Sequence, residues 1–286
     1  MIYGLGAALG WGLADLWAAI SGRRIGAVAT VLTAQLVSAV LTTLLVLATG
    51  TDLSGAREVV GWLLPNALLM AGGYFALYRG LELGPVTVVS PILASYAIIP
   101  VLLAEGLLGE RLSIVVALGI VVTIGGAMLS STDLRLWGSG VSRAPGLPWA
   151  VASAVLFGFA AYVFGWAAHT AGWLPTLWIS RISTTAVFFL AALLLRAKPF
   201  GGARDWTGGF HLLGLAALVG LVDLVGAVMY ARGADVGYVS IVTAASATYP
   251  ILPVLGGTFY LKERPAPNQV IGIAFVLAGL LAVGLG

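Results

Sequence analysis

Long apolar runs alternate with short polar segments along the whole chain. The runs are continuous and do not alternate residue by residue, which favours helices over the strands of a barrel. A helix that crosses a bilayer needs about 20 mostly apolar residues. The pattern therefore predicts an all-α membrane protein with ten transmembrane helices, at about 2–20, 27–49, 59–80, 85–108, 112–130, 147–169, 173–195, 207–231, 236–261 and 267–285.

Composition gives the same class of protein. Of 286 residues, 60% are hydrophobic and only 9% are charged, whereas a soluble domain carries about 25% charged residues. So few charges cannot cover a water-exposed surface, which argues against a soluble enzyme, and a net charge of only +3 gives no reason to expect a nucleic-acid partner. The expected partners are membrane lipids and a small-molecule substrate.

The sequence contains no motif for a metal site, a cofactor or a catalytic centre. Cysteine is absent, and the two histidines, His169 and His211, are too far apart for a local metal motif. No phosphate-binding loop follows a strand, so transport driven directly by ATP within this chain is not expected. We therefore predict no metal, no cofactor and no enzymatic activity.

The chain repeats itself internally. A shift of 153 residues places Arg79-Gly80 on Arg232-Gly233 and Tyr96 on Tyr249, and a shift of 146 pairs Gln35 with Arg181. The longest connection falls between the copies, which predicts two five-helix domains, 1–131 and 147–286. Because five is odd, the second domain must enter the membrane inverted, an architecture common in secondary transporters.

Three motifs carry a family resemblance. They are Trp11-Gly12-Leu13-Ala14-Asp15, Gly109-Glu110-Arg111-Leu112-Ser113 and Leu261-Lys262-Glu263-Arg264. With the ten-helix, five-plus-five layout, the chain resembles the EamA-type transporters of the drug/metabolite transporter superfamily. The resemblance implies a carrier of small organic metabolites in the cytoplasmic (inner) membrane, often an exporter.

Loop charges predict an orientation. With a cytoplasmic N-terminus, the inner loops would hold three basic residues, Arg57, Arg111 and Arg232, and the outer loops would hold ten. Cytoplasmic loops normally carry the excess of Lys and Arg. The charges thus predict both termini outside, opposite to the arrangement that the family resemblance implies.

Charged residues within the predicted helices are candidates for function, because burying them in a membrane is costly. Asp15 or Asp223 could couple a proton or contact a cationic substrate group. Alternatively, Asp223 could form a structural pair with Arg181 or be a hydrogen-bonded neutral acid. Arg181 and its repeat counterpart Gln35 could bind a substrate carboxylate or brace the two halves. Asn66 is a further polar candidate, or a hydrogen-bonding group at the helix kink after Pro65.

Aromatic residues far from the loops could line an amphipathic cavity, although single tyrosines more often serve packing. They are Trp11, Tyr74, Tyr78, Tyr96, Tyr162, Trp166, Tyr230 and Tyr249. The symmetric pair Tyr96 and Tyr249 is the strongest signal among them. Nearby prolines predict kinks that face the cavity or simple bends of the helices: Pro91, Pro100, Pro250 and Pro253.

Together these patterns predict a secondary transporter that exports small organic metabolites, such as amino acids or amphipathic compounds, by alternating access with possible proton coupling. An uptake carrier for a sugar-like solute, a channel and an intramembrane enzyme are the alternatives. The i,i+3 pairs Arg79–Glu82 and Arg232–Asp235 could be gates or ordinary surface pairs. Gly6 and Gly10 form a small-residue face, for internal packing or for a weak homodimer, so a monomer or weak dimer is expected.

Overall fold

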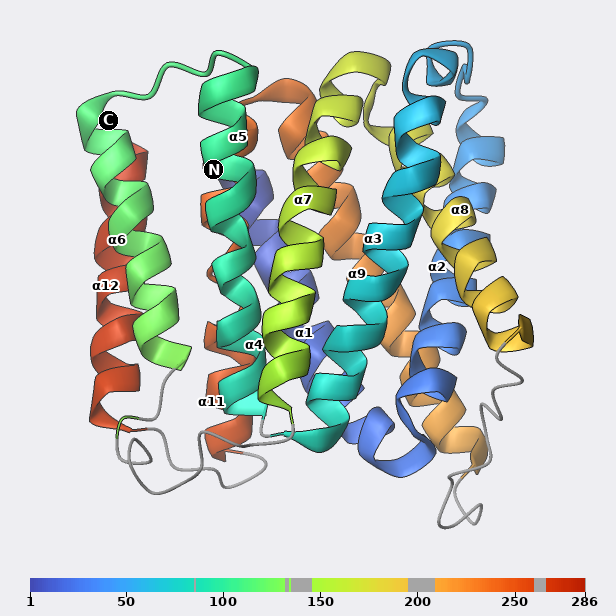
Figure 1. Ribbon diagram of the computed structural model, residues 1–286, viewed down its shortest axis with the longest axis horizontal. Helices are drawn as coiled ribbons and strands as arrows, with labels where there is room; N and C mark the ends of the chain where they lie inside the picture. Colours follow the sequence, from blue (N-terminus) through green and yellow to red (C-terminus); the bar gives the residue numbers. More distant parts are fainter. Residues whose placement is uncertain (85, 132–133, 135–145, 195–208, 260–265, 286) are drawn as a thin grey trace.

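A computed structural model of the chain describes residues 1–84, 86–131, 134, 146–194, 209–259 and 266–285. Within these ranges the regular elements are all helical and there is no strand. The helices run side by side as one bundle (Figure 1). They are α1 (Ile2–Ile25), α2 (Ala27–Thr49), α3 (Ala56–Leu83), α4 (Val86–Ala94), the 3₁₀ helix η1 (Ser95–Ala97), α5 (Ile98–Leu107), α6 (Ile114–Ser131), α7 (Leu147–Ala171), α8 (Trp173–Leu194), α9 (Gly209–Val236), α10 (Val239–Ser246), α11 (Ile251–Phe259) and α12 (Pro267–Leu285).

The lengths of the helices fit a membrane protein. Five of them, α2, α3, α7, α8 and the 213–236 part of α9, are long and apolar enough to cross a bilayer. Others are shorter apolar helices, including those of the fourth and ninth predicted spans. The all-α membrane class is confirmed, and the division into ten complete crossings stays a prediction.

The fourth and ninth predicted spans are both interrupted. In the fourth span, η1 separates α4 from α5, and in the ninth a turn at 247–250 separates α10 from α11. Pro100 lies in α5, Pro250 in the turn and Pro253 in α11, while the side chain of Pro91 in α4 is outside the described residues. Hydroxyls bind carbonyls beside the breaks: Ser95 Oγ donates to Ile92 O at 2.7 Å and Thr248 Oγ1 to Ala245 O at 2.8 Å. Such bonds satisfy backbone groups that a broken helix leaves open.

The internal repeat is visible in the backbone. Gly26 joins α1 to α2 with φ 88° and ψ 154°, and Gly172 joins α7 to α8 with φ 87° and ψ 154°. A positive φ of this kind is readily adopted only by glycine. These two residues are separated by the shift of 146 found in the sequence, so the two halves make the same turn at the same place.

The two halves interlock. Helix α1 packs against α9, α3 against α7, and α6 against α12, so each of these pairs joins one half to the other. Glycines allow the close approach: a Cβ on Gly10 would lie 2.6 Å from Gly226 N, and one on Gly126 would lie 2.6 Å from Val276 N. Gly6 also faces α9, at Met229. The small-residue face of α1 thus packs within the chain.

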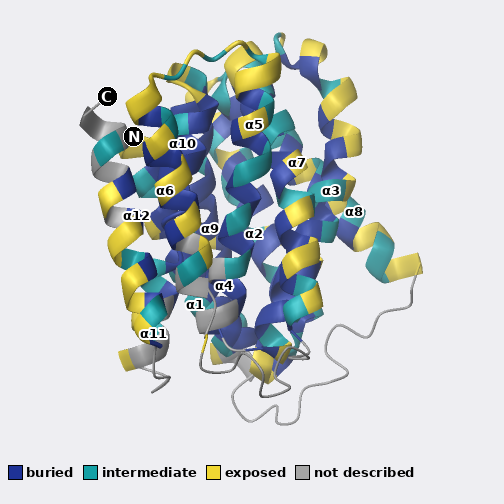
Figure 2. Cartoon of the chain, turned by 60° about the vertical axis from the view of Figure 1, so that its left-hand side comes forward, coloured by how far each residue is buried: buried dark blue, intermediate teal, exposed yellow. Residues whose placement is uncertain are grey.

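Residues in the interior of the bundle are buried, and residues on its outer faces are exposed. Figure 2 shows buried residues filling the middle of the bundle and exposed residues along the outer faces of helices such as α6 and α12. Many of the exposed side chains are large and apolar, among them Leu47, Leu68, Leu118, Val121, Leu193 and Ile271. An apolar outer surface of this extent suits contact with lipid rather than with water.

Candidate functional site

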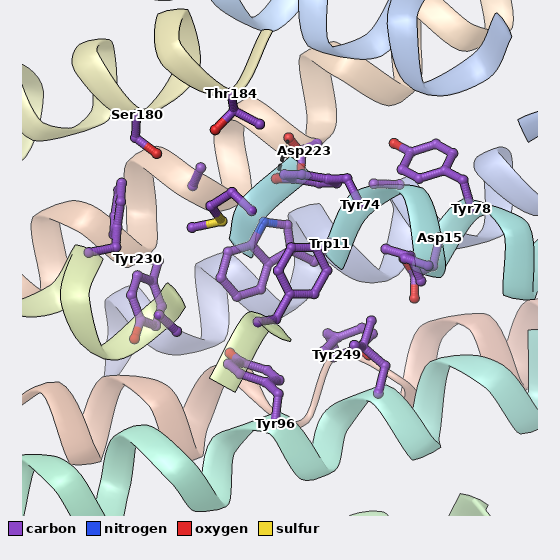
Figure 3. A pocket seen from close by; sticks show the side chains of 18 of the residues that line it. Trp11, Asp15, Tyr74, Tyr78, Tyr96, Ser180, Thr184, Asp223, Tyr230 and Tyr249 are labelled. Atoms are coloured by element: carbon purple, nitrogen blue, oxygen red, sulfur yellow. Dashed lines mark hydrogen bonds between the residues drawn. The ribbon is translucent and has the colours of Figure 1, made fainter. Parts of the chain in front are cut away.

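A cavity of about 100 Å³ lies between the two halves (Figure 3). The first half contributes side chains from α1, α3, α4 and η1, and the second half contributes them from α7, α8, α9 and the turn before α11. The residues that line it are Trp11, Ala14, Asp15, Met70, Tyr74, Leu77, Tyr78, Leu93, Tyr96, Phe157, Ala161, Phe164, Ser180, Arg181, Thr184, Asp223, Ala227, Tyr230 and Tyr249.

An ion pair that is hydrogen-bonded to a tyrosine side chain forms one wall of the cavity. Arg181 Nη1 lies 2.9 Å from Asp223 Oδ2, and the side chains are only 6% and 8% exposed. Arg181 Nη1 also donates to the Tyr74 hydroxyl at 2.8 Å, and that hydroxyl donates to Asp223 Oδ1 at 3.1 Å. The guanidinium carbon lies 5.7 Å from the centre of the Tyr74 ring. Three helices, α3, α8 and α9, are therefore joined through one buried polar cluster.

A second carboxyl, that of Asp15 on α1, lines the cavity and has no ion-pair partner in the described part of the chain. Asp15 is 5% exposed, and its Oδ2 has no hydrogen-bond partner among the described residues. The Ser90 side chain lies close enough to interact with this carboxyl, but the Ser90 hydroxyl forms no hydrogen bond of ordinary geometry within the described residues. The Tyr249 hydroxyl donates to the Ser90 carbonyl oxygen at 2.5 Å, so it is already engaged.

Aromatic rings form most of the remaining surface. Trp11 and Tyr230 lie with ring centres 5.5 Å apart, and Tyr74 meets Phe157 edge to face at 4.9 Å. In the view of Figure 3, Trp11 lies between Tyr74 and Asp223 on one side and Tyr96 and Tyr249 on the other. The hydroxyls of Tyr96 and Tyr230 pair with Ser246 Oγ and Thr243 Oγ1, both at 2.8 Å. Since these hydroxyls are engaged, the rings present mainly apolar faces.

Most of the residues singled out in the sequence lie around this cavity. The structure brings together Trp11, Asp15, Tyr74, Tyr78, Tyr96, Arg181, Asp223, Tyr230 and Tyr249. The cavity lining does not include Gln35, Asn66 or Tyr162. Gln35 is buried in α2, and its Oε1 has no partner within the ranges that the structure describes. Asn66 Nδ2 donates to Ala160 O of α7 at 3.3 Å, and Tyr162 is half-buried on α7.

Several lining residues were not singled out in the sequence, because small, aliphatic, phenylalanine and hydroxyl side chains are common on membrane helices and do not by themselves mark a cavity. They are Ala14, Met70, Leu77, Leu93, Phe157, Ala161, Phe164, Ser180, Thr184 and Ala227. The repeat was a usable signal, because the shift of 146 takes Trp11 to Phe157 and Asp15 to Ala161, and the shift of 153 takes Met70 to Asp223.

Polar contacts also tie the ends of the helices. The pairs Arg79–Glu82 and Arg232–Asp235 both close at 2.7 Å on partly exposed side chains. The Glu110 carboxyl accepts hydrogen bonds from the backbone N–H of Val239 at 2.7 Å, and from the N–H and hydroxyl of Ser240, at the start of α10. It therefore caps a helix of the opposite half. Its repeat counterpart Glu263, with Lys262 and Arg264, lies outside the described residues.

The loop between α2 and α3 holds a capped carboxyl at the surface. The Ser54 hydroxyl donates to Asp52 at 2.6 Å and the Ser54 N–H at 2.9 Å. These bonds favour the ionised form and lower the pKa of Asp52. In the described part of the chain, no group of three or more His, Cys, Asp or Glu residues is arranged to hold a metal ion.

Comparisons with known proteins agree with this architecture. The model of the EamA-like transporter family matches residues 1–132 and again 144–285. No curated protein matches the chain. A crystal structure described only as that of a protein matches with a TM-score of 0.74 and 21% sequence identity, over 99% of this chain and 96% of that one. At this identity the likeness shows a shared fold. Because the family model covers nearly the whole chain in two copies, the protein belongs to the EamA-like transporter family.

Proposed function

We propose that the protein is a secondary active transporter that exports small organic metabolites, such as amino acids or amphipathic compounds, by alternating access. The observation that carries the proposal is the position of the cavity, which takes its lining from both halves and holds three buried charged side chains. Charges at membrane depth are costly and in membrane proteins commonly mark a substrate or ion pathway.

Two features of the bundle support alternating access. The contacts α1–α9 and α3–α7 are related by the repeat, so rocking one half against the other moves both contacts in a matched way. Small residues, such as Gly10 and Gly226, let the backbones of α1 and α9 approach closely, with few side chains between them to obstruct sliding.

Proton coupling through Asp15 or Asp223 is part of the proposal. Asp223 already has Arg181 and Tyr74 as partners, while one oxygen of Asp15 has no hydrogen-bond partner among the described residues. A carboxyl that gains and loses a proton can link substrate release to the proton gradient. The sugar-uptake alternative has less support, because it needs Asp15, Gln35 and Asn66 to line the site, and of these three only Asp15 is among the cavity residues.

Flux into proteoliposomes tests the proposal directly. Purified protein should give saturable, selective flux of one or more amphipathic metabolites, and an imposed pH gradient should change the rate. Conductance far above carrier turnover would support a channel, and a chemical product would support an intramembrane enzyme. Either result contradicts the proposed function.

The proposed location is the cytoplasmic (inner) membrane, with both termini outside, as a monomer or weak homodimer. The orientation rests on the excess of Arg and Lys in the loops opposite the termini. A reporter that is active only in the cytoplasm should be silent when fused to Gly286. A signal from that fusion contradicts the orientation.

A further inference from the structure

The cavity is lined by two carboxyl groups but by only one positively charged side chain. Arg181 and Asp223 neutralise each other, and Asp15 remains. Resting on the proposed function, we propose that the transported molecule is an organic monocation, an amine with an apolar or aromatic body, and that its ammonium group binds Asp15.

Arg181 is poorly placed to bind an anionic substrate. Its Nη1 contacts both Asp223 Oδ2, at 2.9 Å, and the Tyr74 hydroxyl, at 2.8 Å, and its guanidinium lies over the Tyr74 ring. A substrate carboxylate would have to displace Asp223 and leave that residue buried without its partner, which is strongly unfavourable. The positive charge of the cavity is therefore already used within the protein.

Asp15 is in the opposite situation. Its carboxyl lines the cavity, is about as buried as Asp223, and forms no ion pair among the described residues. Its unpartnered Oδ2 can only accept a hydrogen bond when ionised, and an ammonium group offers three donors. The nearby Ser90 hydroxyl, also unpartnered, supplies a further polar contact on the same side.

The aromatic rings near Asp15 also suit a cation with an apolar body. Tyr78 and Tyr249 lie within electrostatic reach of its carboxyl, and Trp11 is one helical turn away on α1. Ring faces attract cations, and the same faces cover an apolar body. Thr184, whose buried hydroxyl has no partner in the described residues, offers a separate polar contact for an amphipathic substrate.

The repeat predicts one cation per molecule of transporter. The shift of 146 places Ala161 opposite Asp15, and Ala161 also lines the cavity. The inverted half thus carries no matching carboxyl at that position. A single site for a single positive charge follows.

Three probes that share one phenyl body and differ in charge test the inference. Phenethylamine is a cation, phenylalanine a zwitterion and 3-phenylpropionate an anion at neutral pH. We expect phenethylamine to bind to the purified protein at least about tenfold more tightly than phenylalanine, and phenylpropionate to bind most weakly. Calorimetry gives the affinities, and flux into proteoliposomes gives the transport preference.

Variants separate the role of Asp15 from a loss of fold. Asp15→Asn should remove the preference for the amine while the neutral analogue phenethyl alcohol binds as before, and Asp15→Glu should restore the preference. Asp52→Asn, which removes an exposed carboxyl from the α2–α3 loop, is the matched control and should change nothing.

Three results overturn the inference. They are tighter binding of phenylalanine or phenylpropionate than of the amine, an unchanged amine preference in Asp15→Asn, or binding of none of the probes. Saturable phenylalanine flux that is insensitive to Asp15→Asn overturns the cation inference and leaves the proposed function standing. Absence of saturable flux for every metabolite in a broad panel counts against the proposed function itself.

Discussion

The two halves of the molecule share a scaffold and differ at the cavity. Both turn at a glycine of nearly identical φ and ψ, and both break their fourth helix. At the cavity, however, Arg181 stands where the first half has Gln35, and Asp223 where it has Met70. The symmetric features build the shared scaffold, whereas the residues that break the symmetry give the cavity its charge.

Helix usage differs in the same way. Helix α8 contributes Ser180, Arg181 and Thr184 to the cavity, while its counterpart α2 contributes none of the lining residues. Gln35 is consequently buried outside the cavity although it matches Arg181 in sequence. Substitutions that make the halves more alike, or that weaken contacts at which the halves meet, test this difference.

The largest effect is expected when Arg181 is replaced by glutamine, the residue that the first half has at the equivalent position, Gln35. Arg181→Gln leaves Asp223 buried without its cation and should lower the free energy of unfolding by about 3–5 kcal/mol. Adding Asp223→Met, again the residue of the first half, should recover much of this stability while transport stays low. Thermal unfolding in detergent measures both variants, and a double variant no more stable than the single one contradicts the account.

A side chain at the α1–α9 contact should have the next largest effect. Gly10→Ala places a Cβ 2.6 Å from Gly226 N and should cost about 1–3 kcal/mol while slowing transport. Gly61→Ala is the control, because a Cβ there meets nothing within 4 Å. Thermal unfolding and flux should separate the two variants, and equal behaviour would falsify the role of this contact.

The symmetric tyrosines each form a hydrogen bond to the other half, but to different groups. Tyr249→Phe removes the hydrogen bond to the Ser90 carbonyl, and Tyr96→Phe removes the bond to the Ser246 hydroxyl. Each should lower the free energy of unfolding by about 0.5–1.5 kcal/mol. Denaturant or thermal unfolding is the measurement, and a loss confined to one tyrosine shows that the pair is not equivalent.

The smallest effect is expected at the exposed ion pairs. Arg79→Ala and Arg232→Ala should each change stability by less than about 1 kcal/mol, with a smaller difference at high salt, because the pairs are partly exposed and screened. If the pairs act as gates, transport rates will change much more than stability. Comparing flux with melting temperature for each variant distinguishes a gate from a surface pair.

The sequence was sufficient for much of the fold and for part of the cavity. Runs of apolar residues locate helices because their length is set by the bilayer, and the repeat follows from identical residues at fixed spacing. Depth in the membrane can be read in this way, but the direction in which a side chain points around the helix depends on which helices pack together. Asn66 illustrates this, because it lies on α3 with Tyr74 yet faces Ala160 of α7 rather than the cavity.

Residues such as Phe157 and Thr184 could not have been identified from their own segments. Their contribution arises only when α7 and α8 meet helices of the other half. The ion pair of Arg181 and Asp223 was only one of several alternatives open in the sequence, because a pairing between α8 and α9 depends on the register of those helices.

The packing of α1 on α9 has a consequence for how the protein is made. Gly10 and Gly226 touch in the folded bundle but are separated by about 200 residues of chain. At a synthesis rate of about 5–20 residues per second, the first helix is complete roughly 10–40 seconds before its main partner emerges. Throughout that interval the Gly10 face of α1 has no α9 to pack against, so the first helix enters the membrane well before the contact that later covers this face can form.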